Sequence, residues 1–339
     1  MAEAGSWMAR EIASAPDIVA RQEVSLAEPM AQLASRLKKS PPQLVVTCAR
    51  GSSAHAADFA KHLIELHLGI PVAAAAPSIA SVYGRSLQLR GQLVLVISQS
   101  GASDDLIAFV GSARRAGAFT VAIINDETAP LASACEWTVP IGAGREHSIP
   151  ATKTFVATLA VMLRLTAAWA DNALLEHAVR RLPRRLADAS ALDWSDGVNA
   201  IGDTNGLATI GRGPTLAIAR EAALKLKETC NLHAEAFSGA EFLHGPIALV
   251  SRRYPLLLFM PTDAASSGMR ELFVRLERMG TDALCAEPGG RLPSLDPEQP
   301  DADAVCLIQA FYGMLVRLTE RLGIDPDRPR HLEKITRTT

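Results

Sequence analysis

The stretch "QLVLVISQSGASDDL", residues 92–106, joins an apolar run to a turn of hydroxyl side chains and then to acidic residues. An apolar run of this length, bounded by small polar residues, is typical of a strand buried on both faces of a parallel sheet. Ser and Asp favour the first turn of a helix, where backbone N–H groups lack partners. The stretch therefore predicts a strand, a turn and a helix in that order.

The same pattern recurs along the whole chain. Short apolar runs alternate with longer Ala- and Leu-rich segments of helical periodicity, as in βαβ units. Strands are predicted at 44–49, 72–76, 92–98, 119–124, 136–141, 206–211, 254–260 and 282–287, and helices at 151–169, 214–231, 265–279 and 302–322. This alternation predicts an α/β fold in which parallel sheets are flanked by helices.

Two of the predicted strands end alike, in "TCARGSS" at 47–53 and "ATIGRGPT" at 208–215, which suggests an internal duplication. A chain of 339 residues has room for two domains of roughly 150 residues each. The charged segment 180–196 contains a proline and is interpreted as a linker. The predicted domains are therefore residues 1–185 and 196–339.

The composition limits the kinds of partner. The chain has 34 basic and 36 acidic residues, so a nucleic-acid surface or an anionic-membrane surface is not expected. Its five cysteines are widely spaced and form no Cys-x-x-Cys pair, so neither a disulfide framework nor a zinc site is expected, and no metal or other cofactor is predicted. The charged start does not resemble a signal peptide, and no run approaches ~18 uninterrupted apolar residues. We expect a cytoplasmic protein with a small-molecule partner.

The turn after the strand at 92–98 has the composition of an anion site. Ligands of open parallel sheets bind beyond the carboxyl ends of the strands, where helix N-termini present free N–H groups. One such turn could equally be a helix N-cap. A second hydroxyl turn, however, follows a neighbouring strand and could face the same point. Together the two turns favour a phosphate monoester, with Ser98, Gln99, Ser100, Gly101 and Ser103 in one turn and the "RGSS" hydroxyls at 50–53 in the other.

A second group of ionisable side chains lies between residues 221 and 246. Glu221, Lys225 and Glu228 have the i, i+4, i+7 spacing that places them on one helix face. They could form a solvated stripe, or one carboxylate could carry a proton between adjacent carbons of an open-chain sugar. Residues 233–246 add His244 and other ionisable groups with little helical periodicity, and we interpret them as a site loop. That context favours the proton carrier.

Seven motifs, in order along nearly the whole chain, resemble one family. They are "MAREI" (8–12), "SQSGAS" (98–103), "EHSIPATKTF" (146–155), "ALKLKE" (223–228), "HAEAF" (233–237), "EFLHGP" (241–246) and "DRPRHLEKITRT" (327–338). They resemble the sugar isomerase (SIS) domains in the isomerase half of glucosamine-6-phosphate synthase. The resemblance implies two tandem flavodoxin-like SIS domains, a hexose-6-phosphate site, and a homodimer whose active site is shared between subunits.

The resemblance also implies roles for individual residues. Ser53, Ser98, Gln99, Ser100 and Ser103 would hold the phosphate. Glu228 would shuttle a proton between C1 and C2, and Lys225 would support it. His244, reaching in from the neighbouring subunit, would open the sugar ring, and Lys334 would form a Schiff base with the ketose or otherwise contact C2. Weaker substrate contacts would come from Gly51, Ser52, Ile149, Ala151 and Glu221.

The chain departs from the family pattern in two places. "SIPATK" (148–153) replaces the usual Gly-Val-Ala-Ser-Thr-Lys, which alters the contact expected near Ala151. No glutaminase domain precedes residue 1, so glutamine-dependent synthase activity is not expected. The expected function is an SIS-type glucosamine-6-phosphate deaminase that yields fructose 6-phosphate and ammonia. Fructosamine-6-phosphate deglycase and galactosamine-6-phosphate deaminase are alternatives within the class, and a phosphosugar-binding regulator is an alternative outside it.

The two halves are not expected to bind sugar equally. "FMPTDAASSG" (259–268) stands where the second half would carry its phosphate turn, and it lacks Ser-Gln-Ser-Gly. One sugar site per chain is therefore expected.

Overall fold

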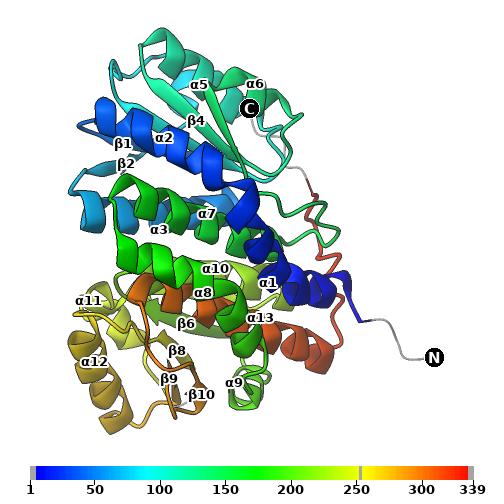
Figure 1. Cartoon of the computed structure of the whole chain (residues 1–339). Coiled ribbons are helices and arrows are strands. Elements are labelled where there is room, and N and C mark those ends of the chain that lie inside the picture. The colour runs from blue at the N-terminus through cyan, green and yellow to red at the C-terminus, as the bar shows by residue number, and fades with distance from the viewer. Residues whose placement is uncertain (1–4, 252–253, 335–339) are drawn as a thin grey trace. The chain divides into compact units, whose positions relative to one another are not determined.

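The computed structural model describes residues 5–251 and 254–334, and within these residues the chain forms two parallel five-stranded sheets flanked by helices (Figure 1). The predicted α/β fold class is confirmed. All eight predicted strands are present, with ends that differ from the prediction by at most two residues.

The first sheet has the strand order β2-β1-β3-β4-β5, and β3 runs through its middle with all six residues buried. Helices α5 and α3 lie on opposite faces of this sheet (Figure 1). The strands are β1 (Val45–Ala49), β2 (Val72–Ala74), β3 (Leu93–Ser98), β4 (Phe119–Ile124) and β5 (Trp137–Pro140). The helices of this half are α2 (Ala27–Lys39), α3 (Gly51–Leu68), α4 (Ser78–Ser81), α5 (Asp104–Arg115), α6 (Pro130–Ala134) and α7 (Lys153–Trp169).

The second sheet has the order β10-β9-β8-β6-β7. Helix α12 packs on one face of it through Met269, Leu272 and Leu276. The strands are β6 (Gly206–Gly211), β7 (His233–Ser238), β8 (Leu256–Phe259), β9 (Ala283–Glu287) and β10 (Leu292–Pro293). The helices are α1 (Trp7–Ser25), α8 (Ala173–Ser190), α9 (Ser195–Ile201), α10 (Thr215–Cys230), α11 (Gly239–Phe242), a 3-10 turn (Pro246–Leu249), α12 (Ser266–Arg278) and α13 (Pro300–Leu322).

The two sheets have one topology. Numbered along its own half of the chain, each sheet has the order 2-1-3-4-5, which is that of flavodoxin. Gly51 and Gly213, which follow the first strand of each half, adopt similar left-handed backbone angles (φ +53° and +57°). The repeat seen in "ARGSS" and "GRGPT" therefore extends to the whole architecture.

The compact units do not follow the predicted boundaries of 1–185 and 196–339. One unit holds the second sheet and comprises the residues up to Asp17, Glu146–Val156 and His177–Leu332. The other holds the first sheet and comprises Ile18–Arg145 and Ala157–Glu176, with Glu333 and Lys334. Two segments from the first half of the chain, the residues up to Asp17 and Glu146–Val156, thus belong to the unit of the second sheet.

The predicted linker at 180–196 is wrong, because α8 runs through its first half and continues past Pro183. Leu175, Val179, Leu182 and Leu186 are buried at helical spacing along α8. Burial of this apolar stripe outweighs the backbone hydrogen bond that a proline removes.

Helix α13 is a core helix. Its 23 residues are long and apolar enough to cross a membrane by length and composition, yet 83% of its most apolar window is buried within the protein. A helix that is apolar all round is expected in the interior of a protein of this size.

Candidate functional site

The two predicted hydroxyl turns lie next to each other at the carboxyl edge of the first sheet. Strands β1 and β3 pair in parallel with Ala49 opposite Ile97, so the turn after β1 and the turn after β3 leave the sheet side by side. Arg50 connects them, because its guanidinium donates two hydrogen bonds to the buried carboxylate of Asp105 in the first turn of α5 (3.0 and 2.7 Å). The structure therefore brings the two turns together as predicted.

The turn after β3 is shaped by its own backbone. The Gly101 N–H donates to Ser98 Oγ (3.0 Å), and the Ala102 N–H lies 3.5 Å from Ser100 Oγ. Ser103 stands at the N-cap of α5, yet within the described chain its hydroxyl makes no capping hydrogen bond. The N-cap interpretation therefore does not account for Ser103, whereas a ligand at the N-termini of α3 and α5 would find hydroxyls and backbone N–H groups there.

The helix α10 carries the second predicted group, on one face as expected. Lys225 is 1% exposed and forms ion pairs with Glu221 (3.4 Å) and with Glu228, both on α10. Glu221 is fully buried, whereas the Glu228 side chain is 20% exposed. The cluster is therefore not a solvated stripe. It is a buried pair that supports one carboxylate reaching the surface.

The cluster keeps its lysine charged. Burial alone would lower the pKa of Lys225, but the two carboxylates outweigh burial and raise that pKa above its usual value. Helix α13 adds a neutral partner, since the Tyr312 hydroxyl donates to Glu221 Oε1 (3.1 Å). Burial, followed by the neighbouring Glu221 carboxylate, raises the pKa of Tyr312 well above its usual value, so this hydroxyl keeps its proton.

The segment 146–153 is held in place by two buried carboxylates. Glu11 of α1 accepts the N–H groups of His147 (2.5 Å) and Ser148 (3.2 Å) and lies 3.5 Å from the Lys153 ammonium. Glu146 accepts the N–H of Thr152 (2.6 Å). Burial raises the pKa of Glu11 despite these donors. Ile149 and Ala151, the predicted weak substrate contacts, are half-buried within this fixed segment.

Asp327 ties the start of the C-terminal motif to the N-terminal motif. Its carboxylate accepts the N–H groups of Trp7 (2.7 Å) and Met8 (2.8 Å) at the start of α1, and its carbonyl accepts the N–H of Ile149 (3.1 Å). A carboxylate here also complements the positive end of the helix dipole. This contact between residues about 320 positions apart fixes the chain seven residues before Lys334.

The remaining two catalytic candidates are His244 and Lys334. His244 is exposed between α11 and the 3-10 turn, next to Leu243 (41% exposed) and near Leu249 (51% exposed). Lys334 is the last described residue and is half-buried. The predicted site loop at 233–246 is wrong in its first part, because residues 233–238 form the edge strand β7.

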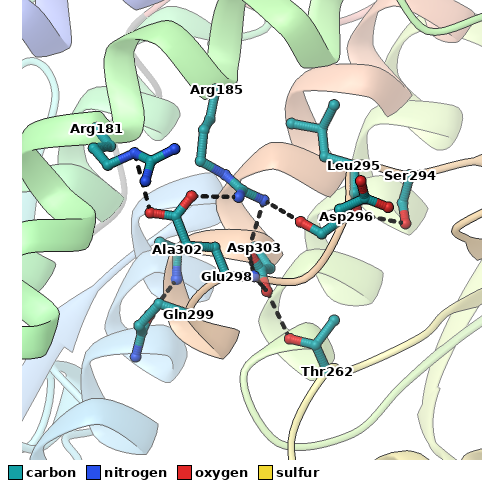
Figure 2. Close-up of polar contacts among 10 residues, drawn as sticks. All are labelled: Arg181, Arg185, Thr262, Ser294, Leu295, Asp296, Glu298, Gln299, Ala302 and Asp303. Carbon is teal, nitrogen blue, oxygen red and sulfur yellow. Dashed lines mark hydrogen bonds and ion pairs between the residues drawn. The ribbon is translucent and has the colours of Figure 1, made fainter.

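The second sheet fills the position that corresponds to the phosphate turn with its own side chains. The Thr262 hydroxyl, just after β8, donates to the buried carboxylate of Asp303 (2.7 Å), which also accepts from Arg185 (2.8 Å). Arg185 further donates to Glu298 and to the carbonyl of Asp296, as Figure 2 shows. An internal anion thus lies at this edge, in agreement with the missing Ser-Gln-Ser-Gly.

Sequence reasoning missed several residues that shape the site: Glu11, Arg50, Asp105, Glu146, Tyr312 and Asp327. Glu11, Glu146 and Asp327 lie inside the motifs that carry the resemblance, so a signal for them existed. Tyr312 sits in an apolar helix and gave no signal. Within residues 5–251 and 254–334, no group of three or more His, Cys, Asp or Glu side chains comes together as a metal site.

Comparison with known proteins places this geometry in a family. The sequence matches the SIS domain family over residues 40–168 and 201–285. An isomerizing glutamine–fructose-6-phosphate aminotransferase of Bradyrhizobium diazoefficiens is 30% identical, and the match covers 97% of this chain and 58% of that protein. The chain thus spans little more than half the length of this curated relative.

Solved structures show the same fold. The crystal structure of a candidate phosphosugar isomerase from Silicibacter pomeroyi DSS-3 is 40% identical, with a TM-score of 0.91 over 95% of this chain and 100% of that one. Glucosamine-6-phosphate deaminase from Thermotoga maritima superposes with a TM-score of 0.78 over 98% of this chain and 100% of that one, and its 22% identity speaks for the fold alone. Because the family match covers more than half of the chain and falls on both sheets, the chain belongs to the SIS domain family.

Proposed function

We propose that this protein is an SIS-type glucosamine-6-phosphate deaminase, which converts glucosamine 6-phosphate and water to fructose 6-phosphate and ammonia. One observation carries the proposal: Glu228 reaches the surface while a buried ammonium, Lys225, and a second carboxylate, Glu221, lie directly behind it. Such an arrangement suits a base that must accept and return a proton.

The proposed reaction moves one carbon-bound proton along the sugar. The Glu228 carboxylate takes the proton from C2 of the open-chain amino-aldose and returns it to C1, while the C2 amine loses a proton and the C1 oxygen gains one, which leaves a ketimine at C2. Water then adds to the C2=N bond, and ammonia leaves. Lys225 offsets the negative charge that develops while the C2–H bond breaks.

The phosphate end of the substrate is proposed to bind at the two turns after β1 and β3. Ser53, Ser98, Gln99, Ser100 and Ser103 would supply hydroxyl and amide groups at the N-termini of α3 and α5. Binding energy gained at this group, remote from C1 and C2, would help to orient the reacting carbons. Lys334 and His244 are proposed, from the family resemblance, to contact C2 and to open the ring.

The direct test is to incubate the purified protein with glucosamine 6-phosphate, without glutamine, and to measure ammonia and fructose 6-phosphate together. Equal release of both supports the deaminase. Glu228→Gln is expected to lower turnover by ~10²–10⁴-fold, since it removes the proton carrier. The variant should still be stabilised against heat by fructose 6-phosphate. Near-normal turnover of Glu228→Gln would rule out its role.

The alternatives predict other products. A fructosamine-6-phosphate deglycase remains a second candidate because Pro150 and Ala151 change the segment that Glu11 and Glu146 hold in place. It would leave glucosamine 6-phosphate intact and release glucose 6-phosphate from the glycated amine. A regulator would bind phosphosugars and turn over neither compound.

We also propose a cytoplasmic homodimer in which His244 serves the partner subunit's site. The exposed Leu243 and Leu249 beside His244 support a covered surface at this point. Mixing and refolding two inactive variants, Glu228→Gln and His244→Ala, should restore part of the activity if the site is shared. A monomer by sedimentation would contradict this assembly.

A further inference from the structure

We propose that Tyr312 is a positioning residue for the proton transfer: through its hydrogen bond to Glu221 it sets how Lys225 is shared between Glu221 and Glu228, and thereby the pH range in which the base is ionised. The inference rests on the proposed role of Glu228 as the base. Tyr312 itself is fully buried, and we propose no contact between Tyr312 and the substrate.

The geometry makes a chain of four groups from two helices. Tyr312 of α13 donates to Glu221 Oε1 (3.1 Å), Glu221 lies 3.4 Å from the Lys225 ammonium, and Lys225 donates to Glu228. The first three groups are each at most 1% exposed, and only Glu228 reaches the surface. A change at Tyr312 can therefore reach the reacting end through fixed contacts.

The balance of charge explains what the buried Glu221 contributes to the proton transfer. While Glu228 is ionised, Lys225 faces two carboxylates. When Glu228 takes up a proton from the substrate, Lys225 would be left as an unpaired buried cation if Glu221 were absent, and such a charge is costly. Glu221 keeps Lys225 paired in both protonation states, and the Tyr312 hydroxyl stabilises the Glu221 anion. The base can thus gain and lose a proton without a change in the charge state behind it.

Other charged groups lie near the chain of four. The Glu146 carboxylate acts on Tyr312 from the 146–153 segment, and Glu11 interacts with both Glu146 and Lys153. These groups are unchanged in the variants below, so their electrostatic effect on the chain of four groups is the same in each variant.

Two substitutions should move the pH profile in opposite directions. In Tyr312→Phe, Glu221 loses a donor and draws Lys225 more strongly, so the acidic limb of the kcat/KM profile should move to higher pH by about half to one pH unit. In Glu221→Gln, Lys225 serves Glu228 alone and a neighbouring negative charge is gone, so the acidic limb should move to lower pH by about one pH unit, with roughly tenfold lower kcat.

A double variant tests whether Tyr312 acts through Glu221. In the Glu221→Gln background, Tyr312→Phe should move the limb no further, because the anion that the hydroxyl supports is already absent. Thr209→Val is the matched control. The buried Thr209 hydroxyl donates to the Ala219 carbonyl of α10 (2.7 Å) but touches none of the ionised groups in the chain of four, so its loss should lower stability and leave the profile in place.

A second readout needs no substrate. In the free protein labelled with [δ-¹³C]glutamate, the first proton should enter the Glu221–Glu228 pair at higher pH in Tyr312→Phe than in the wild type, with Glu228→Gln used to identify the signals. If the wild type acts on no phosphosugar while this titration moves as expected, the proposed function fails, and only the coupling of Tyr312 to the Glu221–Glu228 pair stands. If product forms but Tyr312→Phe and Thr209→Val give the wild-type profile and titration alike, the role of Tyr312 is overturned. If Tyr312→Phe does not fold, Glu221→Gln provides the test. An acidic limb that stays in place in Glu221→Gln would then overturn the role of Tyr312.

Discussion

At the scale of single residues, Gly101 is the most constrained position of the turn after β3. Its backbone is left-handed (φ +62°), and a Cβ there would lie 2.3 Å from Ile124 Cδ1 and 2.6 Å from Ala129 Cβ. We expect Gly101→Ala to cost about 2–4 kcal/mol of unfolding free energy, from backbone strain and overpacking together. The same change should abolish the thermal stabilisation by fructose 6-phosphate, because the turn must shift. Urea unfolding and thermal shift measure the two effects.

Gly69 supplies the control for this prediction. Its backbone is equally left-handed (φ +66°), but among the described residues no atom lies within 4 Å of the Cβ position. Gly69→Ala should therefore cost only the backbone term of about 1–2 kcal/mol and leave sugar binding intact. Equal stability losses and equal binding in the two variants would show that the packing around Gly101 is not the constraint.

Sequence patterns predicted those site residues that lie together within one short segment. The Ser98–Ser103 turn and the Glu221, Lys225, Glu228 spacing could be read directly, since each lies within one short segment. The partners that orient them come from distant segments, such as Asp105 for Arg50 and Tyr312 for Glu221. No spacing rule reports contacts of that kind, so the supporting half of the site had to come from the structure.

At the scale of elements, apolar runs predicted eight of the described strands and missed β7 and β10. Strand β7 has the six-residue sequence His-Ala-Glu-Ala-Phe-Ser. Its ionisable side chains favour the prediction of a site loop over that of a strand. Strand β10 has two residues, too few for any pattern. Pro183 and the charges at 180–196 predict a linker over part of α8, although the buried leucines of α8 have the helical period.

The charges of α8 that suggested a linker include a buried structural ion pair. Arg185 is 9% exposed and donates to Glu298 and Asp303 (2.8 Å each). Replacing one partner of such a pair leaves the other charges uncompensated, so Arg185→Met should cost about 3–5 kcal/mol of unfolding free energy. Arg181 pairs with the same Glu298 (3.3 Å), but its side chain is 54% exposed. Arg181→Met should therefore cost at most about 1 kcal/mol.

The cost of Arg185→Met should depend on pH. Burial raises the pKa of Asp303 even beside its donors, and loss of the guanidinium raises that pKa further. A carboxyl whose folded-state pKa exceeds its unfolded value stabilises the fold at low pH and loses that contribution as pH rises through the folded-state pKa. Urea unfolding should therefore show a larger gap between wild type and Arg185→Met at pH 8 than at pH 5. A gap that widens on acidification would contradict the uncompensated carboxylate.

At the scale of the whole molecule, two sheets of one topology have different carboxyl edges. The first presents hydroxyls and helix N-termini, whereas the second is closed by Asp303, Thr262 and Arg185. An internal carboxylate at the position of a ligand anion excludes that ligand by charge and by volume. The duplication could be predicted from the repeated Arg-Gly turns, and so could the missing Ser-Gln-Ser-Gly. The Asp303 carboxylate that takes the place of this turn could not be predicted, because Asp303 comes from a helix about 40 residues further along the chain.

The start of α1 and the start of the C-terminal motif meet at Asp327, and this contact leads to the last prediction. Its carboxylate holds the first two N–H groups of α1, while its carbonyl holds Ile149. Asp327→Ala should cost about 1–2 kcal/mol of unfolding free energy through the lost cap. It should also free the tail that carries Lys334, so turnover should fall about tenfold or more and proteases should trim the C-terminus faster.

Ser6→Ala separates these two effects, because among the described residues Ser6 Oγ accepts only the N–H of Ala9 (3.2 Å), in the same first turn. It should cost a similar cap energy and leave both turnover and trimming at the wild-type level. Denaturation measures the unfolding free energy, and product formation measures turnover. Mass spectrometry after brief proteolysis measures the trimming of the C-terminus. If Asp327→Ala behaves like Ser6→Ala in all three, Asp327 is a helix cap alone. If only Asp327→Ala loosens the tail and slows turnover, the Asp327 carboxylate links the first helix to the segment that carries the C-terminal lysine.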